Sequence, residues 1–166
     1  MSYRFMICKT DEDWEEYTLY ILEHKLEIHS SFLAKRVIHF IKEQIFFGCA
    51  VLAKDEFGRI IGVLGFVNGT PENGFADKEA VRLEMVHILS EYRCTRLFYR
   101  GMIWLRNYLQ ENAPETKIIQ FYADAGSAKR SRLLGKIADL VCTEQTRFGL
   151  ENEYVTSVDR LSRQRI

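Results

Sequence analysis

Apolar and polar positions along the chain change their period several times, and each change predicts the start of another element. Tyr3–Cys8 alternates in the manner of a short strand. A helical pattern follows, and either Thr10 or Asp11 can cap its N-terminus. A second helix is predicted from Ser31 to about Phe46. The first helix has apolar positions at mixed spacings of three and four residues, which predicts a buried face. Those positions are Trp14, Tyr17, Leu19, Ile21, Leu22 and Leu26.

The middle of the chain has the pattern of a hairpin followed by a loop. Cys49–Lys54 and Ile60–Asn68 are apolar runs separated by the polar turn Asp55–Arg59. Gly58 can supply the positive φ that such a turn requires. Gly69–Lys78 is rich in Gly and Asn and contains a proline, so we expect a loop there.

The second half of the chain adds strands alternating with helices, and then a closing hairpin. The predicted elements are a strand at Ala80–Leu89, a helix near Thr95–Glu111, a strand at Lys117–Ala123, a helix near Ser127–Leu140, and paired strands at Thr143–Phe148 and Tyr154–Asp159. The order is therefore β α α β β β α β α β β. No repeat, low-complexity tract or linker interrupts it, which predicts a single α/β domain over residues 1–166.

Charge and cysteine content narrow the class of protein. The 23 basic and 23 acidic residues balance, which argues against a dedicated nucleic-acid binder. The 4 cysteines form no C-x-x-C pair, so a cytoplasmic setting fits best. The N-terminus lacks the pattern of a signal peptide, and the longest apolar run, Ile45–Ala53, is too short to span a bilayer. We therefore expect no membrane association.

The turn after Ala80–Leu89 is the most informative stretch. It delivers a strand directly into a helix, where unpaired backbone N–H groups favour an anion. Basic residues gather there and again in a later segment, which suits a small polyanion, although solvated helix faces would give the same clusters. No glycine occurs from Ala80 to Arg100, which is unusual for a phosphate loop. The basic residues are Arg93, Arg96, Arg100 and Arg106, then Lys129, Arg130, Arg132 and Lys136.

The strand, turn and helix around Arg93 resemble the GNAT superfamily of N-acetyltransferases. In that family the loop reads Arg or Gln, two residues, Gly, one residue, then Gly or Ala, and its backbone N–H groups hold the pyrophosphate of acetyl-CoA. Arg93 matches the first position, whereas Arg96 and Phe98 occupy the two positions of small residues. The order of elements is similar to the family over nearly the whole chain. It implies an α/β (α+β) fold with a mixed, mostly antiparallel sheet of about seven strands and helices on both faces.

The resemblance also implies which residues contact acetyl-CoA. The guanidinium of Arg96 can hold a phosphate in place of close backbone contact, since Arg binds phosphate as a bidentate fork. In the later helix, Ser127 stands where an Asn often contacts the cofactor, and Leu134 stands where many members carry a Tyr that protonates the leaving thiolate. Ser127 can equally be a plain helix cap. The implied cofactor-binding residues are Val86, Ile88, Arg93, Cys94, Thr95, Arg96, Leu97, Phe98, Ser127 and Arg130.

Acetyl transfer to an amine needs a base, and the strand before the loop offers Glu84 and His87. A regular strand directs these two side chains to opposite faces, so both can serve only if a bulge intervenes. Glu84 is the first choice, because a carboxylate on an apolar strand favours a raised pKa or a cleft. The alternatives are a solvated Glu84 and a core His87. Tyr122 and Tyr154 can replace the missing acid.

A metal site is not expected. His24, Glu27 and His29 are close in sequence, but only His24 and Glu27 share a helical face, and no second cluster completes a coordination sphere. A solvated helix end explains them.

Two functions fit these residues. The first is an N-acetyltransferase that moves an acetyl group directly from acetyl-CoA to an amine of a small molecule or protein. The second is a catalytically inactive GNAT-like module that binds acyl-CoA or a protein partner. An acyl-CoA enzyme that makes an amide signal shares the fold and stays open. Pairing of the last strands leaves a homodimer open as well.

Overall fold

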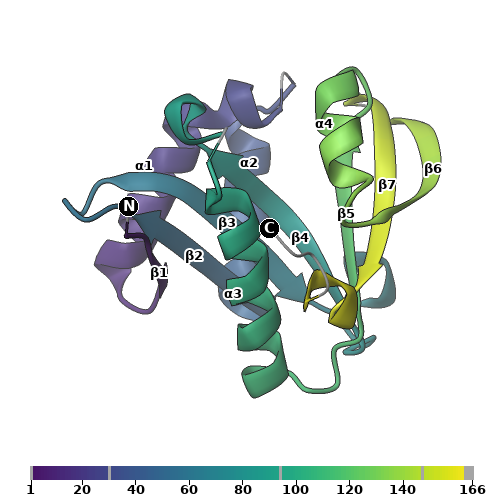
Figure 1. The fold of residues 1–166 in the computed structure, drawn as a ribbon, viewed down its shortest axis with the longest axis horizontal. Coiled ribbons are helices and arrows are strands. Elements are labelled where there is room, and N and C mark those ends of the chain that lie inside the picture. Colours follow the sequence, from purple (N-terminus) through teal and green to yellow (C-terminus); the bar gives the residue numbers. More distant parts are fainter. Residues whose placement is uncertain (1, 30, 94, 147, 163–166) are drawn as a thin grey trace. The chain divides into compact units, whose positions relative to one another are not determined.

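The helices and strands of the computed structural model follow the order that the sequence predicts (Figure 1). The structure describes residues 2–29, 31–93, 95–146 and 148–162. The strands are β1 (Arg4–Ile7), β2 (Gly48–Lys54), β3 (Ile60–Asn68), β4 (Ala80–Ile88), β5 (Ile118–Asp124), β6 (Asp139–Thr146) and β7 (Gly149–Ser157). The helices are α1 (Asp11–Ile28), α2 (Ala34–Phe47), α3 (Leu97–Asn112) and α4 (Ala128–Leu134).

The strands form a 7-stranded mixed sheet in the order β1-β2-β3-β4-β5-β7-β6. β2 pairs antiparallel with β1 and with β3, and β7 pairs antiparallel with β5 and with β6. Only β4 and β5, among the pairs whose direction is described, run parallel. The mostly antiparallel mixed sheet that the resemblance implied is therefore confirmed.

The chain divides into two compact units. The first unit contains Met1–Val67 and Glu84–Trp104, and the second contains Asn68–Leu83 and Leu105–Ile166. β4 and α3 each contribute residues to both units, so each unit holds its own part of the sheet. The single domain over residues 1–166 stays a prediction.

In the first unit, α1 and α2 pack against each other and against β2. The Thr10 hydroxyl accepts a hydrogen bond from the Asp13 N–H, and the Asp13 carboxylate accepts from the Thr10 N–H, which confirms Thr10 as the cap. The buried face differs from the prediction, because Leu19 and Leu26 are exposed while Tyr20 is buried. Tyr17, Tyr20 and Ile21 share one stripe of α1, and positions 19 and 26 fall on its other side.

The second unit contains the clearest errors in the predicted boundaries. The helix predicted over Ser127–Leu140 ends at Leu134, and β6 already begins at Asp139. Ile137 and Ala138 are buried in the turn between them, and the Thr156 hydroxyl donates to the Ile137 carbonyl over 2.7 Å. Their apolar character reflects burial in a turn rather than a helical face.

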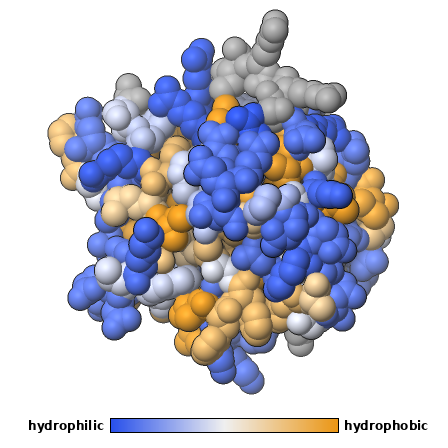
Figure 2. Space-filling view, turned by 90° about the horizontal axis from the view of Figure 1, so that it is seen from below, coloured by the Kyte–Doolittle hydropathy of each residue, from blue (hydrophilic) through white to orange (hydrophobic). Residues whose placement is uncertain are grey.

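On the face drawn in Figure 2, hydrophilic residues predominate, and apolar residues are exposed among them. Within the described part of the chain, no helix has the length and apolar character needed to cross a bilayer.

Candidate functional site

Glu84 takes part in a chain of hydrogen bonds that links β4 to both N-terminal helices. The Gln44 amide on α2 donates to Glu84 Oε1 over 3.3 Å. The Tyr17 hydroxyl on α1 donates to Gln44 Oε1 over 2.6 Å. Tyr17 and Gln44 are fully buried, and Glu84 is half-buried. The carboxylate is therefore held in a fixed direction by an amide that is itself fixed in the core.

Gly65 on β3 makes room for this hydrogen-bond chain. A Cβ atom at this position would clash with the Tyr17 hydroxyl and with Gln44 Oε1. The absence of a side chain on β3 thus lets the two polar groups meet inside an apolar core, where an unpaired polar group would be costly.

His87, near the end of β4, is buried against α1. Its Nε2 lies 3.0 Å from Glu27 Oε2, and its Nδ1 lies 2.8 Å from the Tyr20 hydroxyl. A carboxylate can only accept, so Nε2 carries the proton and Nδ1 accepts from Tyr20. Glu84 and His87 thus both reach the helices α1 and α2, although a regular strand would direct them to opposite faces.

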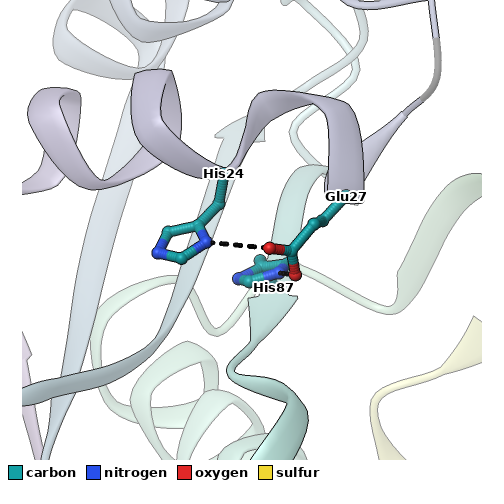
Figure 3. Close-up of side chains that lie close together, drawn as sticks. All are labelled: His24, Glu27 and His87. Atoms are coloured by element: carbon teal, nitrogen blue, oxygen red, sulfur yellow. Dashed lines mark hydrogen bonds and ion pairs between the residues drawn. The ribbon is translucent and has the colours of Figure 1, made fainter.

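Glu27 collects three donors at the end of α1. His24 Nδ1 lies 3.2 Å from Oε1, and an Arg93 guanidinium nitrogen donates to Oε2 over 2.8 Å. Figure 3 shows both imidazoles directed at the one carboxylate, with His24 and Glu27 on α1 and His87 on β4. The hydrogen bonds from His24 and His87 lower the pKa of Glu27 to about 2. Burial lowers the pKa of His87, and its hydrogen bond to Glu27 opposes this shift. Near neutral pH the cluster therefore holds an ionised Glu27 and a neutral His87.

The side chains around Glu27 are close enough together to hold a metal ion, but the guanidinium of Arg93 occupies the same place. Ligand atoms of His24, Glu27 and His87 lie within 4.8 Å of one another. The Arg93 guanidinium contacts Glu27 and lies 3.2 Å from His87 Nε2, so a metal ion would have to displace it. His29 is elsewhere, where its Nδ1 accepts from the Ser31 N–H over 3.1 Å. The sequence correctly set His29 aside, but the expected solvated helix end is wrong, because His87 of β4 joins His24 and Glu27. The absence of a metal stays a prediction.

Arg93 is anchored rather than free for a phosphate. Besides Glu27, its Nε donates to the Ile88 carbonyl over 2.9 Å. The loop backbone is also bonded within itself, because the N–H groups of Tyr92, Arg93 and Thr95 donate to carbonyls of the same turn. The Thr95 hydroxyl accepts from the Leu97 N–H over 3.2 Å. A phosphate at this loop would compete with these bonds.

The other residues predicted to bind the cofactor at the loop separate into two groups. Arg96 is exposed at the start of α3. Val86, Ile88, Leu97 and Phe98 line one apolar cavity in the first unit. Cys94 lies outside the described residues.

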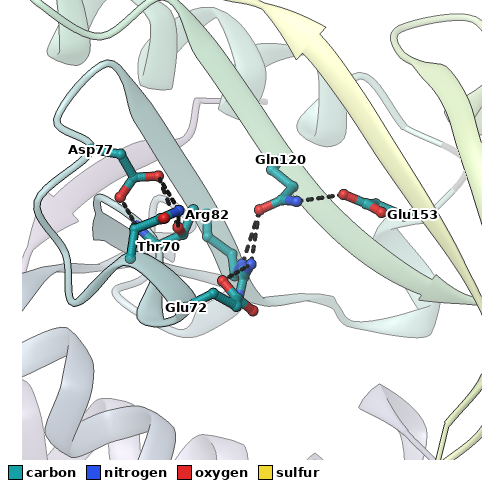
Figure 4. A network of polar contacts seen from close by, with 7 residues as sticks. Thr70, Glu72, Asp77, Arg82, Gln120 and Glu153 are labelled. Carbon is teal, nitrogen blue, oxygen red and sulfur yellow. Dashed lines mark hydrogen bonds and ion pairs between the residues drawn. The ribbon is translucent and has the colours of Figure 1, made fainter.

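The candidates in the second unit lie in a different environment. Tyr122 on β5 is half-exposed, with the Arg82 guanidinium 5.3 Å from its ring centre, and burial raises its pKa. Arg82 donates to both carboxylate oxygens of Glu72, over 2.7 and 2.6 Å, and also to Gln120 (Figure 4). Tyr154, the other candidate acid, is buried. Tyr122 reaches the surface whereas Tyr154 does not, so Tyr122 fits the role of an acid better.

Ser127 acts as a helix cap. Its hydroxyl accepts from the Arg130 N–H over 3.3 Å at the start of α4. Arg130 itself is exposed. Of the two roles considered for Ser127, the structure therefore shows the helix cap.

Comparison with known proteins identifies the fold. No family model and no curated protein matches the sequence. Among solved structures, a ribosomal-protein-S5-alanine acetyltransferase from Vibrio fischeri covers 96% of this chain and 94% of its own, at a TM-score of 0.70 and 13% identity. An aminoglycoside acetyltransferase in complex with coenzyme A and kanamycin covers 99% of this chain and 100% of its own, at a TM-score of 0.69 and 16% identity. A GNAT-family acetyltransferase from Staphylococcus aureus covers 95% of this chain and 99% of its own, at a TM-score of 0.68 and 10% identity. The chain has the GNAT fold.

Within this GNAT fold, sequence reasoning missed the partners of the β4 residues. Tyr20, His24 and Glu27 recur at spacings of four and three along α1, so their polar ends share one stripe. This spacing could have been used to predict a cluster of polar side chains on one side of α1. Gln44 gave no such signal, since a single amide in an apolar helix pattern names no partner.

Proposed function

We propose that the chain is an N-acetyltransferase that moves an acetyl group from acetyl-CoA to an amine. The observation that carries the proposal is the placement of Glu84. A half-buried carboxylate, fixed by Gln44, lies on the strand that leads into the loop and α3 of a GNAT fold. This is the strand from which the resemblance implies that a base acts.

The chemistry assigns a separate task to each residue. Acetyl-CoA would supply an acetyl group activated as a thioester. Glu84 would take a proton from the acceptor ammonium, so that the neutral nitrogen can form the new C–N bond as the C–S bond breaks. Tyr122, which belongs to the second unit, stays the predicted source of the proton for the departing thiolate. His87 has both ring nitrogens engaged in a buried site, so we assign it to positioning Tyr20 and Glu27 rather than to proton transfer.

The residues present fit acetyl-CoA through side chains more than through the loop backbone. Arg96 offers an exposed guanidinium at the positive end of α3, where a phosphate is favoured. Val86 offers apolar surface on β4 and is 40% exposed. The acceptor would be an amine-bearing small molecule or protein, as the names of the similar acetyltransferases suggest. A cytoplasmic setting and a homodimer stay predictions.

A second function is favoured by the loop itself. The N–H groups of Tyr92, Arg93, Thr95 and Leu97 are bonded within the turn. Arg93 is also held by Glu27 and by the Ile88 carbonyl. With these bonds in place, the chain would be an inactive module that binds acyl-CoA or a protein partner.

The test is release of the CoA thiol from acetyl-CoA with a panel of amines, using wild type, Glu84→Gln and Arg96→Ala. We expect Glu84→Gln to lower turnover by about 10²-fold or more while binding acetyl-CoA like wild type. Arg96→Ala should weaken binding of both CoA and acetyl-CoA in a thermal-shift titration. Glu56→Gln, an exposed carboxylate in the β2–β3 turn, is the matched control and should change neither quantity.

Two outcomes would redirect the assignment. Undiminished turnover in Glu84→Gln would remove that residue as the base. Binding of acetyl-CoA without transfer to any amine would favour the inactive module.

A further inference from the structure

An apolar cavity lies in the first unit, bounded by the start of α3 and by residues of β1 to β4. Phe5, Leu64, Val86 and Trp104 contribute large side chains to its lining. Among the lining residues that the structure describes, His87 is the only ionisable one, and its ring nitrogens are bonded to Tyr20 and Glu27. The cavity therefore offers almost nothing to a polar ligand.

Small residues keep this space open. Ala53 and Gly62 face each other across β2 and β3, and Gly101 approaches from α3. Glycine inside a helix is destabilising relative to alanine, so its presence needs a reason. Crowding is not the reason, because the nearest atom to a Cβ at Gly101 would be Phe5 Cε1, at 3.7 Å, an ordinary contact. The missing side chain instead preserves volume between helix and sheet.

The cavity adjoins the residues that the GNAT resemblance assigns to the cofactor. Val86 and Ile88 of β4 and Leu97 and Phe98 at the start of α3 all line it. Val86 is also 40% exposed, so a residue of β4 that lines the cavity reaches the surface. An apolar chain attached to a thioester at β4 would therefore lie beside the cavity lining.

We propose that this cavity receives the acyl chain of an acyl-CoA longer than acetyl. The inference rests on the proposed function, because it requires that the chain bind acyl-CoA. Methylene groups need no hydrogen-bond partners and gain from leaving water, which suits this lining. Each methylene that enters should tighten binding about fourfold. The protein would then transfer acyl groups longer than acetyl as well, again with an amide as the product and the CoA thiol as the leaving group.

The experiment compares the affinities of acetyl-, butanoyl-, hexanoyl- and octanoyl-CoA for wild type and Gly101→Leu. In wild type, we expect affinity to rise about fourfold per methylene until the cavity is full. Leucine at position 101 should fill that space, so the ratio of hexanoyl-CoA to acetyl-CoA affinity should fall to near one. Gln110→Leu is the matched control, since it adds the same side chain at an exposed position of α3 outside the cavity.

Two further measurements guard against a variant that fails to fold. Ala53→Leu fills the cavity from β2 and should lower the same ratio. In wild type, the Met102 methyl resonance should shift with hexanoyl-CoA beyond its shift with acetyl-CoA, because Met102 lines the cavity.

The outcomes separate this inference from the proposed function. Failure of every CoA form to bind would overturn both. Binding of CoA with no gain from chain length in wild type would overturn the acyl-chain site alone. An unchanged gain in both Gly101→Leu and Ala53→Leu would likewise show that the chain lies elsewhere and that the cavity is a packing void.

Discussion

At the scale of residues, the cluster around His87 should make stability depend on pH. Burial lowers the pKa of His87, so the folded state holds it neutral while the unfolded chain becomes protonated below its ordinary value near 6.5. The contribution of the neutral His87 to stability is therefore nearly complete above pH 6.5 and is lost as the pH falls below 6.5, with a slope of up to about 1.4 kcal/mol per pH unit. Glu27, with a pKa of about 2, adds a further loss only below about pH 4.5.

Urea unfolding between pH 7 and pH 5 measures this slope. We expect His87→Gln to flatten it, because glutamine cannot take up the proton. His39→Gln is the control, since His39 is an exposed histidine of α2 that pairs with Glu43. An equal slope in wild type and His87→Gln would contradict the assignment.

The residue scale is also where the sequence says least. Glu84 and His87 could be selected because ionisable groups are rare in an apolar strand. Their hydrogen-bond partners could not be predicted. Gln44 lies 40 residues from Glu84, and Tyr20 and Glu27 lie 67 and 60 residues from His87. Contacts at such separations depend on how helices pack on the sheet, and no local pattern encodes that.

At the scale of elements, the start of α3 depends on one threonine. The Thr95 hydroxyl accepts from the Leu97 N–H and donates to the Tyr92 carbonyl over 2.6 Å, so it joins the loop to the helix. Thr95→Ala should lower the free energy of unfolding by about 1 kcal/mol. Thr95→Ser, which keeps the hydroxyl, should lose much less. Equal losses in the two variants in urea unfolding would show that the methyl group, rather than the cap, stabilises the helix.

Element boundaries could be predicted where a period or a turn residue marks them. The hairpin around Gly58 was predicted correctly, because φ is +83° there and glycine adopts it freely. The end of α4 was predicted wrongly, because Ile137 and Ala138 continue an apolar pattern although they are buried in a turn. An apolar residue that distant parts of the chain bury in a turn cannot be distinguished, from the sequence alone, from an apolar residue on the buried face of a helix.

At the scale of the whole molecule, the division into two units should be visible in local unfolding. Arg82 organises the second unit. Its side chain is only 12% exposed, and its guanidinium joins Glu72 to Gln120 on β5, which in turn donates to Glu153 on β7. Removing the charge leaves these acceptors without their donor. Arg82→Met should therefore lower the free energy of unfolding by about 1–3 kcal/mol.

Hydrogen exchange can locate where that stability is lost. We expect Arg82→Met to speed exchange in β5 and β7 more than in β1, β2 and β3, because its partners all lie in the second unit. Arg59→Met is the matched control, since the Arg59–Glu91 pair is exposed on both sides, at 58% and 53%, and should contribute at most about 1 kcal/mol. A uniform increase across both units would mean that the chain unfolds as one cooperative body. That result would support the single domain predicted from the uninterrupted order of helices and strands.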